Sequence, residues 1–80
     1  MPYNSRSFGI VISRLRTEKG LSQEQLSGLA GISRSHLALL ENGRKTARLD
    51  TLWKLAEALD VTADELIIKT ERSSEANDEG

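Results

Sequence analysis

The chain has 80 residues, of which 38% are hydrophobic and 29% are charged, and its formal net charge is −1. This length suits one small soluble domain, since single domains usually run from about 50 to 200 residues. With no cysteine and one histidine, the composition excludes disulfides, thiolate metal sites and histidine clusters. The longest uncharged apolar run, residues 8–12, is far too short for a membrane span. We expect a cytoplasmic domain with no metal, no cofactor and no membrane contact.

The first predicted helix covers residues 7–19, because Phe8, Val11, Ile12 and Leu15 recur at helical spacing before Gly20. The chain has only three aromatic residues, so its core must consist of Leu, Ile, Val and Ala. In so short a chain, such a core favours packed helices over a β-sandwich.

Three further helix starts share one pattern, in which a Ser or Thr cap is flanked by an apolar residue and followed four positions later by another. The caps are Ser22, Ser33 and Thr62, and Gln25 and Glu65 complete capping boxes at the first and third. Each hydroxyl can accept a hydrogen bond from an otherwise unpaired N–H, worth on the order of 1 kcal/mol. The pattern predicts helices over 23–30, 34–42 and 63–68.

One more helix is predicted over 49–59, where Leu52, Leu55, Ala56 and Leu59 share a face. The predicted fold class is therefore all-α, a compact domain of five helices joined by short loops.

The charge of the chain is unevenly distributed. Residues 70–80 contain four acidic residues, one basic residue and no large apolar side chain, which is typical of disorder. We expect a domain over 1–69 and a disordered acidic tail over 70–80. Within the domain, residues 33–54 contain five basic and two acidic residues, which fits either an ordinary solvated face or a nucleic-acid contact.

Residues 23–42, QEQLSGLAGISRSHLALLEN, have the pattern of two helices joined by a turn at Gly31, which can adopt a positive φ. Ser27 is small where the two helices approach. Apolar residues occupy the positions at which two steeply crossing helices press together: Leu26, Ala30, Ile32, Leu37 and Leu40. This combination predicts a helix-turn-helix motif.

The chain resembles the λ-repressor-like helix-turn-helix domains of Cro/Xre-type bacterial and phage transcriptional regulators over residues 8–68. The matching blocks are 16–23, 31–33, 40–43 and 49–59, together with Leu26. The resemblance implies a sequence-specific regulator, such as a repressor, without an enzymatic step. It also implies that the helix over 34–42 lies in the major groove and that a homodimer binds a palindromic operator in double-stranded DNA.

In this family the first turn of the recognition helix contacts bases, which places Arg34 and Ser35 at base-reading positions. Arg34 can bond O6 and N7 of guanine together, and the alternative is a solvated Arg at a helix end. Ala38 and Leu39 either contact a thymine methyl group or contribute nothing to sequence choice.

The resemblance places phosphate contacts on both sides of the recognition helix. The candidates are Gln23, Ser33, His36, Asn42, Gly43, Arg44, Lys45 and Arg48. Alternatively, His36 contacts a base or has no role. For Arg44 and Lys45, the alternative is an ordinary solvated loop. Arg48 replaces the Ser or Thr cap that is usual in relatives, which predicts a weakly capped fourth helix.

Two further sets of residues complete the prediction. In the family the positions of Arg16 and Glu41 form an ion pair that joins the first helix to the end of the recognition helix. A dimer interface is predicted at Trp53, Leu66, Ile67 and Ile68, and the alternative is that Trp53 covers the core.

Other functions stay open. One is a controller protein of a restriction-modification system, and another is a protein-interaction module, such as an antitoxin whose acidic tail binds a toxin. An enzyme is disfavoured because the chain lacks a Cys nucleophile, a metal cluster and a phosphate-binding Gly-rich loop. No small-molecule ligand is evident.

Overall fold

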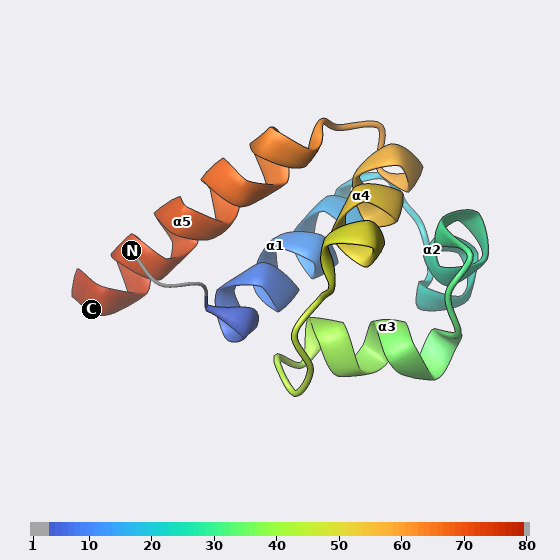
Figure 1. The fold of residues 1–80 in the computed structure, drawn as a ribbon, viewed down its shortest axis with the longest axis horizontal. Helices are drawn as coiled ribbons and strands as arrows, with labels where there is room; N and C mark the ends of the chain where they lie inside the picture. Colours follow the sequence, from blue (N-terminus) through green and yellow to red (C-terminus); the bar gives the residue numbers. More distant parts are fainter. Residues whose placement is uncertain (1–3, 80) are drawn as a thin grey trace.

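The computed structural model describes residues 4–79, with side chains over residues 4–74. The described residues form five α-helices and no strand, which confirms the all-α prediction (Figure 1). The helices are α1 (Ser5–Glu18), α2 (Gln23–Ala30), α3 (Arg34–Glu41), α4 (Leu49–Ala58) and α5 (Ala63–Glu79). Within this part of the chain, no helix combines the length and apolar composition needed to cross a lipid bilayer.

Helix α1 lies at the centre of the fold, between α3 and α5, and contacts both (Figure 1). Helix α2 packs against α3 and α4, and α4 packs against α5. All five helices contribute apolar side chains to one buried core: Phe8, Val11, Ile12, Leu26, Ala30, Leu37, Leu40, Leu52, Leu55, Ala56, Leu59 and Leu66. Because α3 runs along one edge of this bundle, a long side of it stays uncovered.

The predicted helix caps are present. The Ser22 hydroxyl oxygen accepts a hydrogen bond from the Gln25 N–H at 3.0 Å, and the Gln25 side-chain oxygen accepts one from the Ser22 N–H at 2.8 Å. Ser33 caps α3, and Thr62 caps α5 in the same manner. At α4, Arg48 makes no side-chain cap bond, as its departure from the family pattern predicts.

The prediction of a disordered tail over 70–80 is wrong for residues 70–79, because the backbone of α5 is helical to Glu79. Gly80 lies outside the described residues. Leu66, Thr70 and Ser74 follow one another at four-residue spacing and are all buried. The Thr70 hydroxyl donates to the Leu66 carbonyl oxygen at 2.7 Å, which satisfies it without water. The buried side of α5 beyond residue 69 is therefore formed by small polar side chains. The domain continues past residue 69.

Candidate nucleic-acid interface

Helices α2 and α3 form the predicted helix-turn-helix. Gly31 ends α2 with a φ of 71° in the left-handed region, and the Ile32 N–H donates to the Ser27 carbonyl oxygen at 3.0 Å. These features are those of a glycine-terminated helix end. Ser33 then caps α3, with its hydroxyl oxygen 3.0 Å from the backbone nitrogen of His36. The turn is thus fixed by local hydrogen bonds, which set the angle between the two helices.

The inner side of α3 is anchored in the core by Leu37 and Leu40, neither of which has any exposed surface. The four residues predicted to contact bases lie on the remaining surface of this helix: Arg34, Ser35, Ala38 and Leu39. Arg34 and Ser35 are exposed, and 40% of Leu39 is exposed. Within the described residues Arg34 forms no ion pair, so its guanidinium is available to a ligand.

The end of α3 is tied to α1 by Arg16 and Glu41. The Arg16 guanidinium donates through Nε to Glu41 Oε2 at 2.7 Å and through Nη2 to Glu41 Oε1 at 3.0 Å. Its third nitrogen, Nη1, donates to the Leu21 carbonyl oxygen at 2.8 Å. The two side chains are 14% and 5% exposed, and the hydrogen bond to Glu41 raises the pKa of Arg16 above its usual value despite the opposing effect of burial. The ion pair that the family resemblance implies is therefore present, and it is bidentate and largely buried.

Gln23 joins the same network, which the sequence did not indicate. Its side-chain Nε2 donates to Glu41 Oε1 at 3.0 Å, so that Glu41 accepts hydrogen bonds from α1 and from the first residue of α2. Residues 23 and 41 are far apart along the chain, and no local spacing relates them. The Glu41 carboxylate consequently holds the beginning of α2, the end of α3 and α1 in one arrangement.

Gly9 is a second structural requirement that the sequence analysis missed. A Cβ at this position would overlap the carbonyl oxygens of Leu40 and Glu41. Helix α1 therefore lies directly against the last turn of α3, at a separation that only a glycine allows.

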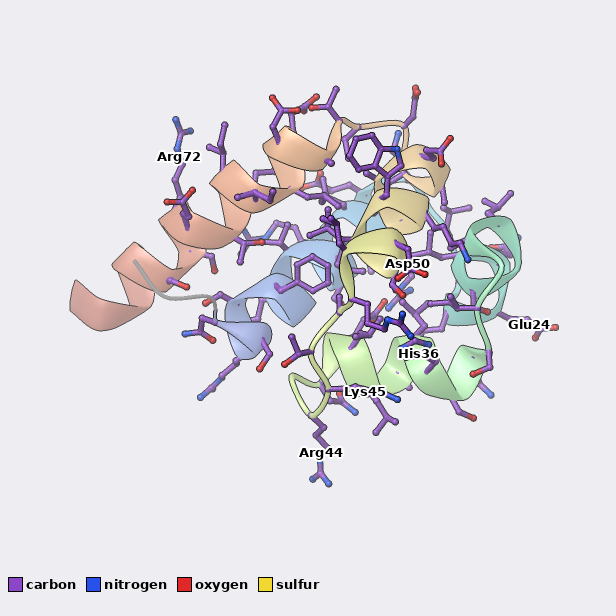
Figure 2. The ribbon with its side chains drawn as sticks, in the orientation of Figure 1. Glu24, His36, Arg44, Lys45, Asp50 and Arg72 are labelled. Atoms are coloured by element: carbon purple, nitrogen blue, oxygen red, sulfur yellow. The ribbon has the colours of Figure 1, made fainter. Side chains whose placement is uncertain are left out.

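The loop after α3 carries most of the predicted phosphate contacts. Asn42, Arg44, Lys45 and Arg48 are exposed, and Gly43 has a φ of 72°. Figure 2 shows Arg44 directed away from the body of the domain.

Two phosphate candidates, His36 and Arg48, are less available than Arg44 and Lys45. His36 is half-buried and lies on the side of α3 that faces α4 (Figure 2). Arg48 has Asp50 as a partner, with Arg48 Nε 3.8 Å from Asp50 Oδ1 and both side chains mostly in solvent.

The predicted dimer interface needs one correction. Leu66 is fully buried in the core, because it faces inward one turn after the Thr62 cap, and it cannot belong to a surface patch. Trp53 is 58% exposed, and Ile67 and Ile68 are each 44% exposed, so Trp53 does not cover the core. Leu49, one turn before Trp53 on α4, is 71% exposed and was not predicted.

The helix-turn-helix family HTH_3 matches residues 12–66, from the middle of α1 into α5. The chain belongs to this family. It is therefore a DNA-binding transcriptional regulator of the Cro/Xre-like type, as the resemblance implied.

Similar proteins in this family carry names that refer to regulation. The chain is 42% identical over 65 residues to the uncharacterized HTH-type transcriptional regulator y4dJ of Sinorhizobium fredii, covering 81% of this chain and 84% of that protein. It is 33% identical over 66 residues to the control protein C.MunI of a Mycoplasma species, covering 81% and 89%. The match to the transcriptional repressor RghR of Bacillus subtilis, 36% identical, covers 79% of this chain but only 47% of the repressor.

Solved structures show the same arrangement of helices. The restriction-modification controller protein C.AhdI from Aeromonas hydrophila superposes with a TM-score of 0.76 at 44% identity, covering 78% of this chain and 94% of that one. The clp gene regulator ClgR from Corynebacterium glutamicum superposes with a TM-score of 0.86 at 25% identity, covering 98% and 85%.

Proposed function

We propose that this chain is a sequence-specific regulator that binds a palindromic operator as a homodimer, with α3 in the major groove. The observation that carries the proposal is the division of α3 into two sides. Leu37 and Leu40 fix its inner side in the core, and Arg34 and Ser35 begin the helix in solvent. A helix held in this way presents the side chains of its first turn to base edges.

Sequence choice then depends on a narrow set of side chains. The planar guanidinium of Arg34 bonds O6 and N7 of a guanine, a contact typically worth about 1 to 3 kcal/mol of discrimination. Ser35 contacts an adjacent base, and Ala38 and Leu39 contact thymine methyl groups. With so few polar side chains available, the shape and deformability of the operator contribute the rest.

Phosphate contacts on both sides of α3 position the domain. On one side, the amide of Gln23 carries two N–H donors, so it can bond a phosphate while it bonds Glu41. Glu41 thereby orients Gln23 for its DNA contact. The other proposed phosphate contacts are Ser33, His36, Asn42, Gly43, Arg44, Lys45 and Arg48.

The homodimer places two copies of α3 on half-sites about one helical turn apart. We propose that Trp53, Ile67 and Ile68, joined by Leu49, form the interface, because they are the large apolar side chains exposed on α4 and α5. Analytical ultracentrifugation of a Trp53→Glu, Ile67→Lys double variant should show a monomer. A dimer of unchanged stability would place the interface elsewhere.

A controller of a restriction-modification system is the more specific candidate. The similarity to the controller protein C.AhdI and to the control protein C.MunI favours it over a repressor without such a context. The antitoxin alternative relied on a disordered acidic tail, and residues 70–79 are instead part of α5. Binding of the purified chain to the DNA upstream of its own gene would distinguish an autoregulating controller.

The deciding experiment is selection of binding sites from a pool of randomised duplexes, at two salt concentrations. The natural chain should enrich a two-fold symmetric site, and Arg34→Ala should lose the preference for one guanine in each half-site. Arg14→Ala is the matched control, because Arg14 is an exposed arginine on α1 that lines a groove with α5. Weak binding without an enriched site would contradict sequence-specific recognition.

A further inference from the structure

The first turn of α1 lies against the loop that follows the recognition helix. The Ser5 hydroxyl donates to the Gly43 carbonyl oxygen at 3.3 Å. A Cβ on Gly43 would lie only 2.8 Å from the Cα of Arg6 and 3.2 Å from its Cβ. Residues 5 and 6 are thus direct neighbours of the loop that carries Arg44 and Lys45, although they are far from it in the sequence.

This turn is held in place by three independent contacts. Asn4 caps α1, with its Oδ1 accepting hydrogen bonds from the backbone nitrogens of Arg6 and Ser7 at 3.0 and 3.1 Å. The Ser5 bond to Gly43 is the second contact, and the close approach of Gly9 to the last turn of α3 is the third. The position of Arg6 relative to the recognition helix is therefore fixed by the fold.

The first half of α1 carries a positive side chain but no negative one. Arg6 is exposed, and in the part of the chain that the structure describes it forms no ion pair. The first acidic residue of the whole sequence is Glu18, so the N-terminal half of α1 carries no carboxylate that could compete with a phosphate. Arg6 thus lies on a segment directly beside the loop that carries Arg44 and Lys45, next to the C-terminal end of α3.

We infer that the first turn of α1 belongs to the DNA-binding surface and that Arg6 contacts the phosphate backbone beside the contacts of Arg44 and Lys45. This inference rests on the proposed function and extends it, since it adds a phosphate contact from an element outside the helix-turn-helix. Because phosphates are the same at every base pair, Arg6 adds affinity and registers the domain on the duplex without selecting sequence.

The test is the salt dependence of DNA binding by Arg6→Gln. Each neutralised phosphate contributes about 0.9 to the slope of log affinity against log salt concentration. Arg6→Gln should lower that slope by about 0.9 per bound protomer, both on the operator and on a mixed-sequence duplex of about 30 base pairs, or three helical turns. Arg6→Lys should keep the slope of the natural chain, because the positive charge is retained.

Two matched variants make the result specific. Arg14→Gln removes the same charge from the same helix but on the side facing α5, where Arg14 shares a groove with Arg72; in Figure 2, Arg72 projects from α5, far from Arg44. Arg14→Gln should leave the slope of log affinity against log salt concentration unchanged. Arg44→Gln tests the proposed function itself and should lower the slope.

The possible failures are distinguishable. A slope unchanged in Arg6→Gln but lowered in Arg44→Gln would overturn the α1 contact and leave the proposed function standing. An equal loss in Arg6→Gln and Arg14→Gln would also overturn it, because the effect would be one of net charge. If the natural chain bound duplex DNA without any salt dependence, both the inference and the proposed function would fail. Circular dichroism melts should be the same for all four variants, since each replaced side chain is exposed.

Discussion

The junction between α1 and the end of α3 differs sharply from the outer side of α3. At the junction, Arg16 and Gln23 each donate to the Glu41 carboxylate, and Gly9 brings α1 and α3 into close backbone contact. On the outer side, Arg34 and Ser35 are exposed, and Arg34 forms no ion pair among the described residues. The residues at the junction thus fix the position of the recognition helix, and the residues on its outer side determine what it contacts. Stability and DNA recognition should therefore be separable by mutation.

The largest loss of stability is expected from Glu41→Ala. This change leaves the buried guanidinium of Arg16 without its carboxylate, and removal of one partner from a buried pair typically costs about 3 to 5 kcal/mol. Urea unfolding followed by circular dichroism should show a loss of this size in the free energy of unfolding.

The matched control is Arg48→Ala, which breaks the exposed pair with Asp50. Exposed pairs contribute at most about 1 kcal/mol, so this variant should unfold almost as the natural chain does. Equal losses in the two variants would show that burial does not distinguish the two pairs.

Gly9→Ala should destabilise the protein by about 1 to 3 kcal/mol, the usual cost of overpacking. Its new Cβ would meet backbone oxygens of α3, which cannot move aside as a flexible side chain can. Gly28→Ala is the control, because Gly28 also lies within a helix but faces open space. That variant should gain roughly 0.5 to 1 kcal/mol from better helix propensity. Gains of stability in both variants would mean that α1 and α3 can separate at little cost.

Ser33→Ala should cost about 1 kcal/mol, because it removes the side-chain cap of α3. Ser33 is also a proposed phosphate contact, so this residue connects the two regions. DNA affinity measured well below the unfolding midpoint should fall as well. If only stability falls, Ser33 belongs with the structural residues alone.

The smallest change in stability is expected for Arg34→Ala. Substitution of an exposed residue without partners usually changes stability by no more than about 0.5 kcal/mol, and alanine suits a helix well. Melting curves should overlap those of the natural chain while guanine preference is lost. A large loss of stability would contradict the separation between the junction and the outer side of α3.

The sequence by itself determined where most helices begin and how the motif turns. The caps at Ser22, Ser33 and Thr62 act within three residues of themselves, and Gly31 needs only its own φ to end α2. Such features can be recognised from a short stretch of chain because their energy comes from neighbours in sequence. The Arg16–Glu41 pair was accessible through family resemblance alone.

Only the tertiary structure decided which surfaces meet. Thr70 and Ser74 look like tail residues by composition, yet they are buried in the continuous α5, which packs against α1. Leu66 looked available for a dimer interface and is instead fully buried. The Gln23 bond to Glu41 joins residues from separate helices. Burial and long-range hydrogen bonds depend on which elements pack together, and that information is not contained in the local spacing of residues.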